Sequence, residues 1–140
     1  MKHTLTLALS AALSLVVSAN AFADKATREY KKSDVDPAVK EAETKFKAAC
    51  GCPLTITVAA NTIDTQDNLY QVKHIANSIS EGAAGYCTDA ESKKAVCQMT
   101  SLEIQRGKEA SFTFKGSKGL AVHDGQSYYP FESMAKQLDK

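Results

Sequence analysis

Hydrophobic residues recur with a helical period in the segment that begins at residue 36. Four apolar positions at three- and four-residue steps share one helix face: Val39, Ala42, Phe46 and Ala49. Asp36 followed by Pro37 is typical of a helix N-cap and first helical position. Gly51 is a suitable C-terminal stop. The pattern therefore predicts a first helix between Asp36 and Gly51.

The next two segments predict a strand and a second helix. Residues 53–59 are β-branched and alternating, as in a strand with one buried face. After a polar loop at 61–66, apolar residues again form a single stripe, made of Leu69, Val72, Ile75, Ile79 and Ala83. Asp64, Thr65 and Asp67 are alternative caps for this helix. The position of its C-terminal end is left open by one turn, because Gly82 and Gly85 each destabilise the helix by about 1 kcal/mol relative to alanine.

From residue 98 onward the period changes to that of strands and tight turns. Alternating segments at 101–105 and 111–115 are separated by a turn at Gly107, and a third strand is expected at 120–123. Asp124-Gly125 favours a hairpin, because both residues tolerate the positive φ of such turns. A return strand is then expected at 126–129. Pro130 would end it and begin a last helix.

Together these elements predict an α+β fold. We expect a mainly antiparallel sheet of about four to five short strands, with two longer helices packed on one face and a short C-terminal helix. A charged connection at 88–95 has room for a short helical turn. Residues 36–140 would form a single domain. Residues 24–35 are polar without an apolar stripe and are expected to be a flexible lead-in.

The first residues have the features of a cleaved secretory signal peptide. Lys2 provides the positive start, 5–17 is an apolar run too short for a typical membrane span, and Ala21-Phe22-Ala23 fits the small-x-small cleavage pattern. Residues 1–23 would be removed, so the mature chain would begin at Asp24. We therefore expect a periplasmic or secreted protein.

Composition limits the partners of the mature chain. It would have 117 residues, enough for one modest core, with 16 basic and 16 acidic side chains. Zero net charge without a clustered basic face argues against nucleic acid or an anionic membrane as the main partner. No second apolar stretch is long enough to span a membrane, and no cysteine follows the cleavage site to accept a lipid anchor. Oligomeric state is left open.

Four cysteines in so short an exported chain predict two disulfides that cross-link the domain. The predicted order places the end of the first helix, the start of the first strand, the end of the second helix and the start of the next strand at one edge of the sheet. This layout favours Cys50–Cys87 with Cys52–Cys97, and the swapped pairing is the close alternative. Each bridge would stabilise the fold by about 3–4 kcal/mol.

A soft-metal site, for copper or zinc, is the alternative reading of the same cysteines. Cys50 and Cys52 lie two positions apart, and further candidate ligands are His74, Met99 and His123. An oxidising compartment favours disulfides instead, so we expect no metal and no cofactor.

Motifs of common enzymes are missing from the sequence. It contains no G-x-S-x-G, P-loop, G-x-G-x-x-G or H-E-x-x-H pattern. His123 and Asp124 could suggest a base with its orienting carboxylate, but sequence neighbours seldom face each other and no nucleophile accompanies them. We therefore assign no catalytic residue.

Two groups of residues are candidate contacts for a protein partner. Tyr128, Tyr129 and Phe131 cluster around Pro130, and tyrosines with one apolar face suit protein interfaces. Asn61 and Asp64 lie in a polar loop between a predicted strand and helix. We expect a small non-enzymatic exported protein that binds another protein, of inhibitor or immunity type.

Overall fold

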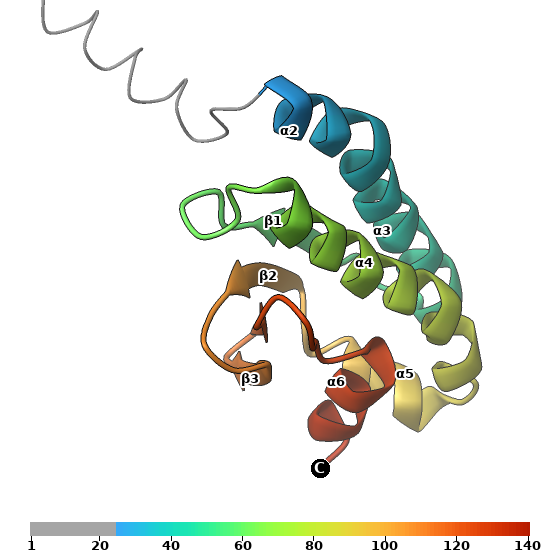
Figure 1. The fold of residues 1–140 in the computed structure, drawn as a ribbon. Helices are drawn as coiled ribbons and strands as arrows, with labels where there is room; N and C mark the ends of the chain where they lie inside the picture. Colours follow the sequence, from blue (N-terminus) through green and yellow to red (C-terminus); the bar gives the residue numbers. More distant parts are fainter. Residues whose placement is uncertain (1–24) are drawn as a thin grey trace, which may run out of the picture.

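A computed structural model describes residues 25–140 of the chain (Figure 1). The predicted signal segment 1–23 and Asp24 lie outside this range. The elements in chain order are α2 (Lys25–Tyr30), the π-helical η1 (Lys31–Val35), α3 (Asp36–Cys50), β1 (Thr55–Val58), α4 (Gln66–Tyr86), α5 (Ala90–Val96), β2 (Ser101–Arg106), β3 (Ser111–Lys115), β4 (Lys118–His123) and α6 (Phe131–Leu138).

The predicted α+β class is confirmed, with a correction to the sheet. Within residues 25–140 the sheet has four strands in the order β1-β2-β4-β3. β1 pairs with β2 and β2 with β4 in parallel, while β3 and β4 form an antiparallel hairpin. The sheet is therefore mixed, not mainly antiparallel. The long α4–α5 connection returns the chain to the start of the sheet, which makes β2 parallel to β1.

The predicted return strand at 126–129 does not form. The Asp124 carboxylate accepts the backbone N–H groups of Gln126 at 2.8 Å and Ser127 at 2.6 Å, and Gly125 has a φ of +93°. This side-chain-stabilised turn directs the chain out of the sheet instead of back along β4. The chain then reaches α4, where the N–H of Phe131 donates to Ser78 Oγ at 3.1 Å.

The lead-in is helical, unlike the flexible segment expected from sequence. α2 and η1 run directly into α3 and bury Thr27 and Val35. Asp36 is consequently not an N-cap: its backbone N–H donates to Lys31 O, and its carboxylate accepts from Lys31 Nζ at 2.7 Å. The π turn lies just before Pro37, which has no N–H to continue a regular helical ladder.

The ends of the two long helices follow the sequence signals. Thr65, one of the three candidate caps, has extended backbone angles, and its Oγ1 accepts the N–H of Asn68 at 3.2 Å. α3 ends at Gly51, which adopts a left-handed φ of +83°. The charged connection after Cys87 contains α5, as the sequence allowed.

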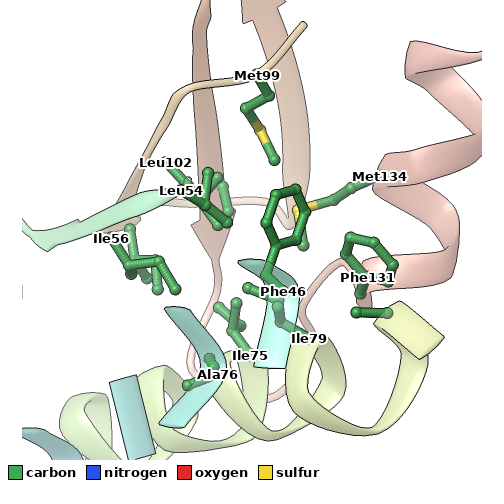
Figure 2. Close-up of a cluster of buried hydrophobic side chains, with 14 of the residues drawn as sticks. Phe46, Leu54, Ile56, Ile75, Ala76, Ile79, Met99, Leu102, Phe131 and Met134 are labelled. Atoms are coloured by element: carbon green, nitrogen blue, oxygen red, sulfur yellow. The ribbon is translucent and has the colours of Figure 1, made fainter. Parts of the chain in front are cut away.

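The core lies between one face of the sheet and the layer formed by α3, α4 and α6 (Figure 1). Figure 2 shows Phe46 projecting from α3 into its centre, beside Met99, Met134 and Phe131. Alternation along the strands puts Leu102 of β2 on this covered face. The opposite face of the sheet carries more polar side chains, including Thr57, Glu103 and Thr113.

Candidate functional site

The amino edge of the sheet, where the parallel strands begin, holds all four cysteines. The structure confirms the predicted pairing, with Cα–Cα distances of 5.2 Å for Cys50–Cys87 and 5.9 Å for Cys52–Cys97. α3 and α4 run side by side and end at this edge (Figure 1). Cys50 and Cys87 are buried, whereas Cys52 and Cys97 are half-buried. One bridge therefore joins the ends of α3 and α4, and the other joins the segments that precede β1 and β2.

The soft-metal alternative loses its ligands in this arrangement. All four cysteines are engaged in disulfides, so none offers a thiolate. Within residues 25–140, no group of three or more His, Cys, Asp and Glu side chains is placed to hold a metal ion. His74 and His123 lie on elements near the opposite edge and do not approach the cysteines.

The carboxyl edge of the parallel strands is built from side-chain hydrogen bonds instead. Arg106 at the end of β2 is the register partner of His123 at the end of β4. The backbone N–H of Arg106 donates to Thr62 Oγ1 at 3.2 Å, and its Nη1 donates to Asn68 Oδ1 at 2.9 Å. Arg106 therefore joins β2 to the β1–α4 loop and to the start of α4. Carboxyl ends of parallel strands are a recurrent position for binding sites in α/β folds.

Three rings form a continuous group beside this edge, which we call the aromatic row: Tyr70, His74 and Tyr128. Tyr70 and His74 make an edge-to-face contact with ring centroids 4.3 Å apart, and His74 stacks on Tyr128 at 6.0 Å with an interplanar angle of 17°. Tyr70 is 50% exposed and is the one large hydrophobic side chain so exposed among residues 25–140. The row thus presents an aromatic surface to solvent.

The helical lead-in extends the same surface. Asp34 of η1 forms an ion pair with Lys73 of α4 at 3.3 Å. A hydrogen bond from Ser33, followed by the contact with Lys73, lowers the pKa of Asp34 and keeps its carboxylate charged. Tyr30 interacts with Tyr70 and Lys73, and burial raises the pKa of its phenol. The lead-in therefore packs against the part of α4 that carries the aromatic row.

His123 is fully buried on the covered face at the end of β4. Burial, with the positive charge of Arg106 second, lowers the pKa of His123 to about 4. Its Nδ1 accepts the N–H of Gly125 at 3.2 Å, which requires a neutral ring with the proton on Nε2. Within the described residues Nε2 has no hydrogen-bond partner.

Asp124 does not orient His123 as a catalytic pair would require. Its carboxylate instead holds the turn described above, and those backbone N–H groups lower its pKa. His123 is thus a neutral, solvent-inaccessible ring without an orienting carboxylate. The geometry gives no support to acid–base chemistry through these two residues.

The structure separates the five predicted contact residues. Tyr128 belongs to the aromatic row and is half-buried, as is Tyr129. Asn61 and Asp64 are exposed in the β1–α4 loop at the carboxyl edge. Phe131 is 1% exposed and makes edge-to-face contacts with Phe46 and Tyr86, both with centroids 6.1 Å apart. Phe131 is therefore a core residue and is unavailable to a partner.

Sequence reasoning missed Tyr70 and Arg106. Tyr70 precedes His74 by four positions on a well-predicted helix, a spacing that places the two rings on one face. The position of Tyr70, outside the apolar stripe of this helix, therefore indicated from sequence that its ring could be exposed beside His74. Arg106 gave no comparable signal, because its partners Thr62 and Asn68 are brought to it only by the sheet register.

Two surface hollows lie elsewhere on the described part of the chain. One of about 390 Å³ lies between α3 and α4 and is lined by Lys45, Ala48, Ala49, Ser80 and Ala84. Another, of about 380 Å³, lies between α5 and α6 and includes Gln98 and Leu138. Both are open and shallow, and neither combines the convergent polar groups of a small-molecule site.

Comparison with protein-family models, with curated protein sequences and with solved structures finds no match to this chain. Across residues 25–140, no helix has the length and apolar character needed to cross a membrane. Any functional conclusion therefore depends on the surface itself.

Proposed function

We propose that this protein is a small, non-enzymatic exported protein of inhibitor or immunity type, which binds a protein partner through its carboxyl-edge surface. This surface comprises the aromatic row, the β1–α4 loop with Asn61 and Asp64, and the Asp34–Lys73 pair. The partner is a protein of the envelope or the extracellular space.

The observation that carries the proposal is the exposure of Tyr70 within the aromatic row. Tyrosine supplies a large contact area with only two side-chain torsions to order, which makes it efficient at protein interfaces. Here the ring is also held by His74, which is held in turn by Tyr128. A partner would meet a pre-ordered aromatic surface, and so lose less conformational entropy on binding.

The surroundings of the row resemble the polar rim of an interface. Asn61 and Asp64 of the β1–α4 loop, and the Asp34–Lys73 pair between η1 and α4, are exposed or half-exposed polar groups. Interfaces commonly place such groups around a central aromatic anchor, where they exclude water and favour one orientation. The disulfides favour an oxidising compartment, in agreement with export.

Site-specific photo-crosslinking tests this proposal. Tyr70 is replaced by a photo-reactive phenylalanine derivative, and the protein is irradiated in envelope extract or culture fluid. We expect one defined cross-linked species from position 70. Adding Tyr128→Ala should weaken it at least tenfold, because removal of a central aromatic anchor costs an interface about 2 kcal/mol or more.

A matched control uses the same photo-reactive group at Lys94, an exposed residue of α5 near the opposite edge. The proposal predicts no cross-linked species from position 94. Equal cross-linking from both positions, or a species from position 70 that is insensitive to Tyr128→Ala, would contradict binding through the carboxyl-edge surface.

A further inference from the structure

The two outer strands of the sheet differ in how their free edges are treated. β1 is the outer strand on one side, and the Glu43 carboxylate of α3 accepts the outward N–H of Ile56 at 3.0 Å. β3 is the outer strand on the other side. Among the described residues, no side chain or backbone group bonds its outward N–H groups. One outward N–H of the β1 edge is therefore capped, whereas the β3 edge is open to a further strand.

The register identifies which backbone groups of β3 face outward. Ser117 O and His123 O accept bonds from Thr100 and Gly107 on the β2 side, so the odd-numbered residues of β4 bond toward β2. Because backbone groups alternate along a strand, even-numbered residues of β4 bond toward β3. Their register partners are Ser111, Thr113 and Lys115. The N–H and C=O groups of Phe112 and Phe114 therefore point away from the sheet.

We propose that β3 pairs with β3 of a second copy, in antiparallel orientation about a two-fold axis at Thr113, to form a continuous eight-stranded sheet. In this register Phe112 lies opposite Phe114 of the second copy, and Phe114 lies opposite Phe112 of the second copy. Each of these two pairs exchanges both backbone hydrogen bonds, so all four outward groups of each copy are satisfied.

The side chains of β3 suit this pairing on both sheet faces. On the covered face, each cross-strand pair brings two phenylalanines together, and the half-buried Phe114 gains an aromatic neighbour. On the opposite face, the exposed Thr113 meets its own copy and Lys115 lies opposite Ser111. Among residues 111–115 no like charges are opposed. This inference is independent of the carboxyl-edge surface, which lies across the strand ends.

The register is tested by cysteine cross-linking of the purified protein. In Thr113→Cys the two introduced thiols would lie across the two-fold axis, in a non-hydrogen-bonded pair with a Cα–Cα distance of about 4.5 Å, within disulfide range. We expect a disulfide-linked dimer on a non-reducing gel after mild oxidation. Thr57→Cys, at an exposed position of β1, is the matched control and should give no disulfide-linked dimer on the same gel.

Equilibrium sedimentation of the unmodified protein across a dilution series supplies the second readout. We expect a reversible monomer–dimer equilibrium, which Thr113→Glu weakens about fivefold because two like charges would then lie directly opposite. Thr57→Glu should leave it unchanged, and far-UV circular dichroism checks that each variant is folded. A monomer at every concentration overturns the proposal. The proposal is also overturned by a dimer that Thr113→Glu does not weaken. Cross-linking of Thr57→Cys to the same extent as Thr113→Cys would overturn it as well.

Discussion

The two ends of the sheet are held together by different kinds of interaction. At the amino edge, one disulfide joins the ends of α3 and α4, and a second joins the segments that precede β1 and β2. At the carboxyl edge, the contacts are single hydrogen bonds around Arg106 and ring contacts in the aromatic row. A disulfide contributes about 2–4 kcal/mol, whereas a hydrogen bond contributes about 1 kcal/mol. Stability is thus concentrated at one end, and the other end carries the exposed aromatic surface.

The largest effect should come from removing the buried bridge. We expect Cys50→Ala with Cys87→Ala to lower the free energy of unfolding by about 3–5 kcal/mol, measured by urea denaturation. Part of this loss reflects the sulfur atoms withdrawn from the core, since both cysteines are buried.

The half-buried bridge is the matched control for that result. The two bridges have sequence separations of 37 and 45 residues, so their loop-entropy contributions are nearly equal. Cys52→Ala with Cys97→Ala should therefore cost less, about 2–3 kcal/mol. An equal or greater loss would mean that burial does not distinguish the bridges.

At the carboxyl edge, the strongest expected effect is a pH dependence caused by His123. The folded chain resists protonating this ring until about pH 4, whereas the unfolded chain takes up the proton near pH 6.5. Stability should therefore be fully present above pH 6.5 and fall by about 3 kcal/mol as the pH drops to 4. Protonation would also break the Gly125 bond, because Nδ1 could no longer accept it.

Urea denaturation between pH 7 and pH 4 measures this dependence. His123→Leu should flatten the curve. The pKa values of Asp34, Asp89 and Asp124 are all lowered, so their contributions are lost only below about pH 4. A slope that survives His123→Leu would assign the pH dependence to another group.

Within the aromatic row, the stacked pair should contribute a small but measurable coupling. A double-mutant cycle of His74→Ala and Tyr128→Ala is expected to give a coupling free energy of about 0.5–1 kcal/mol in urea denaturation. The cycle of Lys94→Ala with Tyr128→Ala should give no coupling, because α5 lies near the other edge. Additive effects of the first pair would mean that the row is not pre-ordered in solution.

The cysteine end was more predictable from the sequence than the carboxyl edge, for physical reasons. Helix and strand order alone brings all four cysteines to one edge, so local patterns favoured Cys50–Cys87 with Cys52–Cys97 and left only the swapped pairing as a close alternative. Strand direction did not follow, because alternation has the same period in parallel and antiparallel strands. The sequence therefore did not show that β2 and β4 pair in parallel.

The carboxyl edge depends on contacts between segments distant in the chain. The hairpin dipeptide at Asp124 predicted a return strand, but the carboxylate instead stabilises a turn that carries Tyr128 to His74. The lead-in has no apolar stripe, yet Val35 enters the core and Asp34 reaches Lys73 of α4. Phe131 was grouped with its tyrosine neighbours, although only the tertiary fold decides which of these rings is buried.

A further effect, as small as that coupling, is a gain in stability at the amino edge, where α4 approaches its bridge. Gly85 is an exposed helical residue, and a Cβ at this position would meet no atom within 4 Å. Gly85→Ala should therefore raise the free energy of unfolding by about 0.5–1 kcal/mol, since alanine loses less backbone entropy on folding.

At Gly82, one turn earlier, the same Cβ would lie 3.1 Å from Phe131 Cδ1. Gly82→Ala should gain less or lose stability, because the buried ring must shift to accommodate it. Urea denaturation of the two variants measures the difference. The coupling between His74 and Tyr128 should be unchanged in Gly85→Ala, since the gain arises at the other end of the helix; a changed coupling would mean that the two edges are not independent.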